Sequence, residues 1–437
     1  MRTRVRVVFI GILPDRPTWP YINYDVDRAA TQVMARLREA LPEVAFQQSC
    51  YYTVQEAQEG YETVEKGHSD GWLVYVTQMW TGIPAFYAEN VRPVVIADEL
   101  YSGSGGFLRT RSLIESHDWP VATVASSDFQ DVVDAVRLLD VVHKMRSSRV
   151  LVISNRQPPG AASPAEVQAV EETFGTRTIL MSGNDLQAIY ESIPKADACP
   201  IRDRWIAEAQ EVIEPDADEI LRSARMYLAT KQAMAQHQAD AVSIDCLSLF
   251  YSNQASAYPC LTFFQLNNDG STGVCEGDLH SVISQLLFRY LTGRPGYVSD
   301  PVIDEAAGQI IYAHCVATNR PFGPDGPGNP YIIRSHAEDH KGASVQSLLP
   351  LGQTVTSMAV SPQERAMGLY TAKTVANVNE EKACRTKLAA EVDVQRVLAN
   401  YHFELFSWHQ VTCYGDHRHA MQQLARLYGL RLIELDR

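Results

Sequence analysis

The segment of residues 274–300 reads VCEGDLHSVISQLLFRYLTGRPGYVSD, and the rest of the chain is interpreted around it. Its apolar residues recur at the spacing of one helix face: Leu279, Val282, Ile283, Leu286, Leu287 and Tyr290. This period predicts an amphipathic helix packed on a core. Glu276 precedes the helix and Asp300 lies in the turn-rich stretch after it. A lone acid before a helix is commonly explained by the helix dipole, so the role of Glu276 depends on what else the chain offers.

Length and charge limit the class of protein. A chain of 437 residues is too long for one core and suits two or three domains. Hydrophobic residues make up 46% and charged residues 21%, which is typical of a globular protein. The net charge of −14 argues against a nucleic-acid backbone or an anionic membrane surface as partner. A neutral or metal-bound small molecule fits better.

The N-terminal residues and the cysteines indicate a cytoplasmic protein. Basic residues precede an apolar run, but Pro14, Asp15 and Arg16 end that run too early for a signal sequence. We therefore expect a first strand there. No apolar run reaches membrane-spanning length. The eight cysteines include no CxxC pair, which is typical of reduced thiols in the cytoplasm.

The first two thirds of the chain alternate between strand-like and helix-like segments. Alternation of this kind predicts parallel sheets covered by helices. We place a first α/β domain at 1–147 and a second at 148–296, which carries Glu276. The expected strands lie at 5–12, 44–48, 72–77, 93–97, 149–154, 177–181, 241–245 and 261–266, and the expected helices at 25–41, 128–146, 164–174 and 200–236.

The pattern of expected secondary structure changes after residue 297. Short β-like runs are separated by clusters of Pro, Gly and Asn, which predicts an antiparallel barrel-like or sandwich domain at 297–437. This domain carries Asp300, His314 and His409. The expected strands are 310–316, 331–335, 344–349, 354–359 and 431–435, with helices at about 386–398 and 419–428.

Two histidines lie in apolar surroundings, where each ring nitrogen needs a partner. His314 lies within a strand-like run and His409 follows Trp408. Taken alone, each histidine could equally be a buried core residue whose ring nitrogens are both hydrogen-bonded. Together with Glu276 and Asp300 they offer two oxygen and two nitrogen donors. Such a set suits Mn²⁺ better than calcium, which prefers oxygen ligands throughout.

Zinc is the main competitor of manganese. Thiolates favour zinc, and three cysteines lie close in sequence to the candidate ligands: Cys275, Cys315 and Cys413. Cysteine is also a common small core residue beside buried sites, and that interpretation is the simpler one.

Other motifs carry less information. Glu276 and His280 are four residues apart and could share a helix face, as could His336 and His340, although residues 336–341 are charged and favour a solvated turn. The glycine-rich 103–106 lacks the full dinucleotide fingerprint and opens no obvious helix, which argues against a nucleotide cofactor. No GxSxG elbow lies between a strand and a helix, which argues against that hydrolase chemistry.

Residues 241–437 resemble the L-fucose isomerase and L-arabinose isomerase superfamily. The resemblance rests on AVSIDC at 241–246, PCLTFFQLNNDG at 259–270, CEGD at 275–278, LTGRP at 291–295, YAHC at 312–315 and WHQVTCYGD at 408–416. The order acid, acid, histidine, histidine is that of the superfamily's metal ligands.

The resemblance implies a fold, a site and a chemistry. The fold is two Rossmann-like α/β domains followed by a C-terminal β-rich domain. Glu276, Asp300, His314 and His409 would bind Mn²⁺, with Zn²⁺, Co²⁺ or Mg²⁺ as alternatives. The two carboxylates would be the acid and base of an aldose–ketose isomerase that works through an enediol or enediolate.

The resemblance also implies partners. The protein would be a homo-oligomer, a trimer or hexamer, in which a neighbour's N-terminal domain covers the site. Trp80, in VTQMW at 76–80, would give an aromatic wall to the sugar, and Trp408 is a second candidate for substrate contact.

Two alternative functions stay open. One is a metal-dependent lyase, decarboxylase or epimerase acting on a modified sugar or sugar acid, because the same site would stabilise an enediolate in those reactions. The other is a catalytically silent sugar-binding protein, which the retained set of two acids and two histidines argues against.

Overall fold

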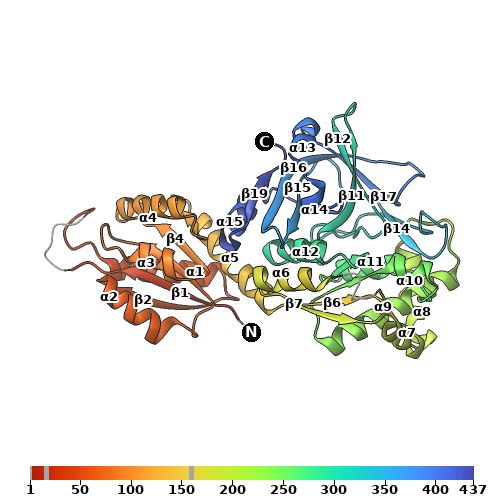
Figure 1. Cartoon of the computed structure of the whole chain (residues 1–437), viewed down its shortest axis with the longest axis horizontal. Helices are drawn as coiled ribbons and strands as arrows, with labels where there is room; N and C mark the ends of the chain where they lie inside the picture. The colour runs from red at the N-terminus through yellow and green to blue at the C-terminus, as the bar shows by residue number, and fades with distance from the viewer. Residues whose placement is uncertain (1, 14–18, 157–161) are drawn as a thin grey trace. The chain divides into compact units, whose positions relative to one another are not determined.

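The computed structural model describes residues 2–13, 19–156 and 162–437, which divide into two compact units (Figure 1). Unit 1 comprises Met1–Lys144 and His419–Arg431, and unit 2 comprises Met145–Arg418 and Leu432–Arg437. Residues 14–16, which end the first apolar run, lie outside the described residues. The division into three domains stays a prediction, since the second and third expected domains together make up most of unit 2.

Unit 1 is built on a five-stranded parallel sheet with the order β2-β1-β3-β4-β5. This is the strand order of flavodoxin-like doubly wound folds. β3 is buried along its whole length, as expected for a parallel strand covered on both faces. The strands are β1 (Arg4–Ile10), β2 (Ala45–Tyr51), β3 (Gly71–Val76), β4 (Val94–Asp98) and β5 (Ala122–Val124).

The helices of unit 1 follow the predicted alternation, with one correction. Residues 103–106 do open a helix, α4 (Ser104–His117). Gly103 is required there because a Cβ would lie 1.7 Å from the carbonyl oxygen of Val76. The glycines therefore serve close packing of this helix on the end of β3. The other helices are α1 (Val26–Ala40), α2 (Val54–Gly60), the π-helical turn η1 (Tyr61–Glu65), α3 (Ile83–Asn90) and α15 (Arg418–Tyr428).

Unit 2 begins with a four-stranded parallel sheet of order β10-β9-β6-β7. Its strands are β6 (Arg149–Ile153), β7 (Arg177–Met181), β9 (Ala241–Ile244) and β10 (Thr272–Cys275). The chain passes from unit 1 to unit 2 in the last turn of α5 (Phe129–Ser147). The helices of unit 2 before α12 are α6 (Pro164–Phe174), α7 (Gly183–Ser192), α8 (Lys195–Glu208), α9 (Ala217–His237), α10 (Cys246–Tyr251) and α11 (Cys260–Asn268).

The strand predicted at 261–266 is wrong, because these residues belong to α11. All nine residues of α11 are buried, so the helix has no exposed face to give its sequence a period. A short apolar run of this kind carries no period that separates a strand from a buried helix.

The helix predicted from the opening segment is confirmed as α12 (Leu279–Thr292), and it lies between the parallel sheet and the barrel of unit 2 (Figure 1). Asp278 caps its first turn by accepting a hydrogen bond from the backbone N–H of Ser281. Gly293, with φ +70°, ends it in a left-handed conformation. α12 contacts β9 and β10 on one side and β11, β15 and β18 on the other.

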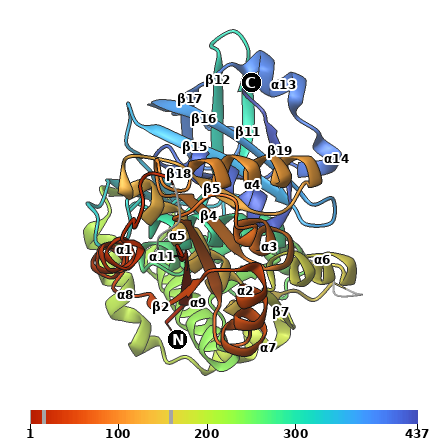
Figure 2. The ribbon, with the colours of Figure 1, turned by 90° about the vertical axis from the view of Figure 1, so that its left-hand side faces the viewer.

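The C-terminal part of unit 2 is a closed antiparallel barrel of six strands, confirming the β-rich, barrel-like prediction. The ring runs β15-β18-β11-β12-β17-β16 and closes through β15–β16, and β19 extends β16. In Figure 2, β12, β17, β16 and β15 run side by side. The strands are β11 (Tyr297–Asp304), β12 (Gln309–His314), β15 (Thr354–Ser361), β16 (Ala366–Asn377), β17 (Thr386–Glu391), β18 (Gln410–Tyr414) and β19 (Arg431–Glu434).

One predicted helix of the barrel region is partly wrong. Residues 386–391 form β17, and the helix α13 (Val394–Asn400) starts only afterwards, followed by α14 (Phe403–Phe406). The alanine-rich TKLAAE favours a helix locally, but pairing with both β12 and β16 makes it a central strand. A small sheet of β8 (Glu211–Val212), β13 (Tyr331–Arg334) and β14 (Ser344–Ser347) completes unit 2.

Candidate active site

Glu276 is presented by a tight turn between β10 and α12. The strand ends at Cys275, and Glu276 and Gly277 both adopt left-handed backbone conformations, with φ of +64° and +70°. A positive φ is uncommon for a residue other than glycine and is found preferentially at functional sites. The turn places the Glu276 carboxylate at the carboxyl edge of the parallel sheet, next to the barrel residues described below.

Three neighbouring barrel strands supply the other candidate ligands. Asp300 lies in β11 opposite Ala313 of β12, and His314 is the last residue of β12. On the other side of β11, Ser299 pairs with Gln410, so His409 enters β18 next to Asp300. The antiparallel pairing therefore brings together Asp300 and His314, from consecutive strands, and His409, from a distant part of the sequence.

The four predicted ligands lie together. The Nε2 atom of His409 is 3.5 Å from Glu276 Oε2 and 3.3 Å from Asp300 Oδ1. The Nε2 atom of His314 is 3.7 Å from Glu276 Oε1. The two imidazole rings are 5.5 Å apart between centroids. Two carboxylates and two imidazoles thus converge on one small volume.

Burial gives the site unusual acid–base properties. It raises the pKa of Glu276, and the nearby charge of Asp300 adds to that rise while His409 opposes it. It also lowers the pKa of His314 to about 4, so that ring is neutral at pH 7. Burial would lower the pKa of His409 as well, but hydrogen bonds to Asp278 and Asp300 raise it well above its usual value. Shifts of this kind cluster at functional sites.

Asp278 is a site residue that the sequence prediction missed. Its Oδ2 atom lies 2.8 Å from Nδ1 of His409. Burial favours the neutral acid, yet the hydrogen bond and charge of His409 hold the pKa of Asp278 well below its usual value. The Nδ1–H of His409 therefore donates to a carboxylate, and its Nε2 faces Glu276 and Asp300. The available signal was the helix N-cap position of Asp278, three residues before Ser281.

His314 is held differently from His409. The backbone N–H of Cys315 donates to Nδ1 of His314 at 2.9 Å. In the neutral ring the proton is then on Nε2, the nitrogen that faces Glu276. Each ring would therefore release a proton from Nε2 to bind a metal there: His409 because its raised pKa keeps both nitrogens protonated, and His314 because its neutral ring carries the proton on that nitrogen.

Two overlapping groups of side chains have the spacing of a metal site. Cys275, Glu276 and His314 form one, and Asp300, His314 and His409 form the other, each with its donor atoms within 4.8 Å of one another. The Sγ atom of Cys275 lies 3.4 Å from Nε2 of His314. Burial raises the pKa of the Cys275 thiol well above its ordinary value, so it is a poor source of thiolate at neutral pH. The oxygen and nitrogen donors fit a divalent cation.

The remaining sequence-predicted residues lie at different places. Trp408 is 53% exposed beside His409, and its indole N–H donates to the carbonyl of Pro301 at 3.2 Å. Trp80 lies in unit 1, in the loop after β3, and is 67% exposed. His280 does not pair with Glu276, because the helix begins only at Leu279; its Nε2 lies 3.8 Å from Glu166 instead.

The segment 336–341 is the turn that its charges predict, and Glu338, His340 and Lys341 are exposed. His336 is buried, and its Nδ1 atom lies 3.3 Å from Asp339, which also accepts a hydrogen bond from the Tyr258 hydroxyl. Glu338 accepts a hydrogen bond from Tyr251 and helps to raise the pKa of Glu276. This segment therefore lies beside the candidate site.

Comparisons with known proteins point to one activity. The sulfoquinovose isomerases of Priestia aryabhattai and Priestia megaterium are each 24% identical over 366 residues, covering 78% of this chain and 79% of theirs. A sulfoquinovose isomerase of a Clostridium species is 23% identical over 184 residues, covering 41% of this chain and 40% of its own. No family model matches the chain. A solved structure described as the XylFII molecule covers 66% of this chain and 94% of its own at 11% identity, with a TM-score of 0.18.

The expectation of an enzyme is confirmed. The chain is an aldose–ketose isomerase, an intramolecular oxidoreductase that acts on a sugar. Membership of the fucose and arabinose isomerase superfamily stays a prediction. No helix among residues 2–13, 19–156 and 162–437 combines the length and apolar character needed to cross a membrane.

Proposed function

We propose that the chain interconverts an anionic aldose and its ketose at the site formed by Glu276, Asp300 and His409, with a divalent cation as cofactor. The observation that carries this proposal is the convergence of two carboxylates, one from the β10–α12 turn and one from β11, on the Nε2 atom of a single histidine. Isomerisation needs one group that carries a proton between adjacent carbons and another that serves the two oxygens, and two neighbouring carboxylates supply both.

The donors present fit a divalent cation. Glu276, Asp300, His314 and His409 would hold it, each histidine after losing the proton on Nε2. Two oxygens and two nitrogens suit Mn²⁺ first and Zn²⁺ or Co²⁺ next, since Cys275 is kept as a thiol by burial. When bound, the cation would polarise the carbonyl and neighbouring hydroxyl of the sugar as a Lewis acid.

The residues of the chain would move the protons. A carboxylate takes the proton from the carbon next to the carbonyl and returns it to the former carbonyl carbon, by way of an enediol. The hydroxyl proton moves in the same direction, from the oxygen on that neighbouring carbon to the former carbonyl oxygen. Glu276 suits the transfer at carbon because burial raises its pKa toward neutral pH, where giving and taking a proton are both efficient. Asp300 then serves the oxygens.

The proposed substrate class rests on the activity of the relatives. Sulfoquinovose is a hexose with a sulfonate group on carbon 6, and the matched relatives cover 78% of this chain. We infer that a sulfonated aldose is the substrate here as well. We further propose that the protein is cytoplasmic and forms a homo-oligomer. Measurement of the size of the purified protein tests the oligomeric state.

Product analysis tests the proposal. Protein treated with a chelator and then reloaded with Mn²⁺ would be incubated with sulfoquinovose and with glucose, and products followed by carbon-13 NMR. We expect a ketose signal from the sulfonated sugar with reloaded protein and none with chelated protein. Formation of a C2 epimer without a ketose would contradict isomerisation and favour the epimerase alternative. Cleavage of a carbon–carbon bond of the sugar would favour the lyase alternative.

A further inference from the structure

Two cysteines of the barrel lie side by side next to His314. β12 ends at His314, which pairs with Thr386 of β17. If this register continues by one residue, Cys315 comes opposite Arg385, the sequence neighbour of Cys384. The thiol of Cys384 donates a hydrogen bond to the sulfur of Cys315. Both thiols are free, Cys315 is buried and Cys384 is half-buried, and neither side chain has a part in the proposed chemistry.

Buried polar contacts fix the turn that carries Cys384. The ammonium group of Lys387 donates to the carbonyl of Cys384 at 2.5 Å. The guanidinium of Arg385 donates to the carbonyl of Ser335 at 2.9 Å. Lys387 and Arg385 are themselves buried, and hydrogen bonds shielded from water are electrostatically stronger. The fold therefore holds Cys384 in place beside the end of β12.

The sulfur of Cys315 has the surroundings of a reactive thiol. Besides the thiol of Cys384, the backbone N–H groups of Arg385 and Ala337 donate to it. Hydrogen-bond donors around a sulfur favour negative charge on it, and the negative sulfur is the form that reacts with oxidants. Redox-sensitive cysteines are often placed next to a second cysteine that captures the oxidised sulfur.

Cys315 is also tied to the candidate site through its backbone. Its N–H donates to Nδ1 of His314 at 2.9 Å, and Nε2 of the same ring lies 3.7 Å from Glu276 Oε1. Bonded sulfurs lie closer together than hydrogen-bonded ones, so a disulfide to Cys384 would draw Cys315 out of its present position. Because the interior is close-packed, that displacement would pass to the ring of His314.

We propose that hydrogen peroxide links Cys315 and Cys384 in a reversible disulfide, and that this disulfide disables the site by displacing His314. Cys315 Sγ attacks one oxygen of the peroxide, the O–O bond breaks, and hydroxide leaves with the thiol proton as water. Cys384 Sγ then attacks the sulfur of the resulting sulfenic acid. The S–S bond forms, the S–O bond breaks, and a second water leaves with the proton of Cys384. The two sulfurs lose two electrons in total, which reduce the peroxide to water.

The test treats the whole chain with hydrogen peroxide and compares wild type with Cys384→Ser and Cys199→Ser. Cys199, on α8, is a half-buried free thiol like Cys384, so its variant controls for the loss of one thiol. Peptide mapping by mass spectrometry without reduction identifies the linked peptides. Mn²⁺ affinity and kcat are measured before treatment, after treatment, and after addition of dithiothreitol.

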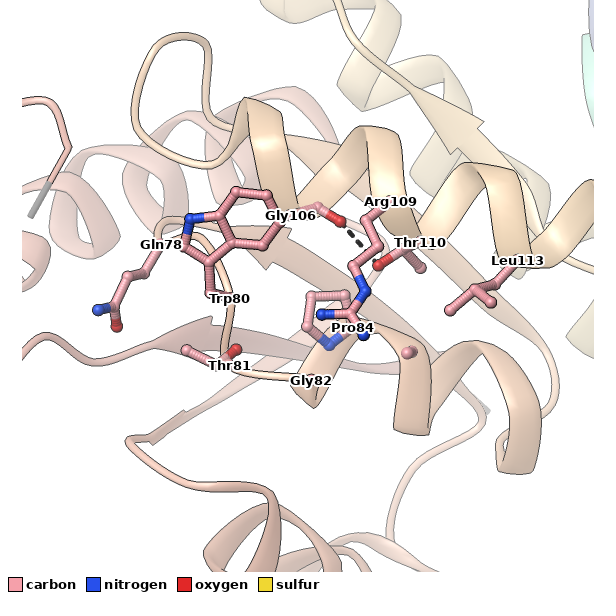
Figure 3. A pocket seen from close by; sticks show the side chains of 10 residues that line it. Gln78, Trp80, Thr81, Gly82, Pro84, Gly106, Arg109, Thr110 and Leu113 are labelled. Carbon is pink, nitrogen blue, oxygen red and sulfur yellow. Dashed lines mark hydrogen bonds between the residues drawn. The ribbon is translucent and has the colours of Figure 1, made fainter.

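A methionine of unit 1 reports oxidation that is not specific to thiols. Met79 is half-buried and precedes Trp80, which Figure 3 shows at a small hollow of that unit. Peroxide converts methionine to its sulfoxide, which dithiothreitol does not reduce. The peroxide dose is therefore chosen to link the cysteines while Met79 stays unmodified.

In wild type we expect a peptide that links Cys315 to Cys384. Mn²⁺ affinity should fall by about 10- to 100-fold, the range for disturbing the support of a metal ligand, and kcat should fall with it. Dithiothreitol should reverse all three changes. Cys199→Ser should behave as wild type does. Cys384→Ser should match untreated wild type in Mn²⁺ affinity and show no loss that dithiothreitol reverses.

The outcomes separate this inference from the proposed function. Absence of the linked peptide in wild type, or a peptide that links Cys315 to Cys260 instead, would overturn the inference. A linked pair that leaves both Mn²⁺ affinity and kcat unchanged would overturn it as well, while the proposed function would stand. If the reduced protein forms no ketose but the linkage forms and lowers Mn²⁺ affinity, the proposed function fails and the inference stands.

Discussion

The Nδ1 atom of His409 lies 2.8 Å from Oδ2 of Asp278, a residue that also caps α12. This hydrogen bond fixes which nitrogen of His409 faces the carboxylates of Glu276 and Asp300. Histidines that bind metals commonly donate their second N–H to a carboxylate in this way, which orients the ring and raises its basicity. The helix that organises the chain thereby also orients the site.

Asp278→Asn should weaken Mn²⁺ binding by about 10- to 100-fold, because an amide orients His409 less firmly and adds no negative charge. Titration of Mn²⁺ by electron paramagnetic resonance measures this affinity. Asp304→Asn is the matched control, since Asp304 lies at the far end of β11 and bonds only the backbone N–H of Ala307 among the described residues. Equal affinity in wild type and Asp278→Asn would contradict the role given to this hydrogen bond.

The same pair predicts a pH dependence of stability in chelated protein. The pKa of His409 is raised on folding, so its contribution is complete below about pH 6.5 and is lost as the pH rises through the folded pKa. The pKa of Asp278 is lowered, so its contribution is present above about pH 4 and is lost as the pH falls. Between these limits wild type should exceed Asp278→Asn by about 1–3 kcal/mol in free energy of unfolding. Urea unfolding at pH values from 4 to 9 should show that this difference in free energy of unfolding becomes smaller at high pH. A difference that stays constant with pH would refute the interaction between Asp278 and His409.

Glu276→Gln should abolish most turnover and leave the fold intact. The amide keeps the shape of the side chain but neither takes a proton nor carries the charge of a ligand, so kcat should fall by about 10²- to 10⁴-fold. Circular dichroism and the melting temperature check the fold. A well-folded variant with near-normal kcat would remove Glu276 from the acid–base pair.

The two histidines should contribute unequally to metal binding. The Nδ1–H of His409 is held by the carboxylate of Asp278 and its Nε2 faces two candidate ligands, whereas Nδ1 of His314 accepts only from the backbone N–H of Cys315. His409→Ala should therefore lower Mn²⁺ affinity more than His314→Ala does. Metal content after dialysis compares the two variants. The reverse order would show that the tautomer of His314 differs in the loaded protein.

Gly103→Ala should destabilise unit 1, because the added Cβ would lie 1.7 Å from the carbonyl oxygen of Val76. Overpacking of this kind costs about 1–3 kcal/mol. Gly328→Ala is the control, since its Cβ would meet only Asn319 at 3.4 Å. Thermal unfolding followed by circular dichroism should show a lower transition for Gly103→Ala alone.

Much of the fold follows from local patterns in the chain. α12 was predictable because its apolar residues keep a helical period, and α6 and β7 match their predicted bounds of about 164–174 and 177–181. The failures have a common cause. α11 is buried on every side and β17 is rich in alanine, so in both cases tertiary packing, which local sequence does not report, decided the structure.

The candidate site shows the same limit. Glu276, Asp300, His314 and His409 stood out as polar residues in structured apolar contexts, and the structure brings all four together. Asp278 did not stand out, because a helix N-cap explains an aspartate at that position completely. Its second role depends on β18 lying beside β11, a pairing between residues more than 100 positions apart.

The most direct test of the central claim is deuterium incorporation during turnover. Mn²⁺-loaded protein in D₂O would be given sulfoquinovose, and proton NMR would follow the signals at carbons 1 and 2, with Glu276→Gln as the control. The account predicts ketose formation, with deuterium entering at carbon 1 or 2 wherever the transferred proton exchanges with solvent, and neither event in the variant. Ketose formed at the wild-type rate by Glu276→Gln, or no ketose from the loaded wild type, would contradict it.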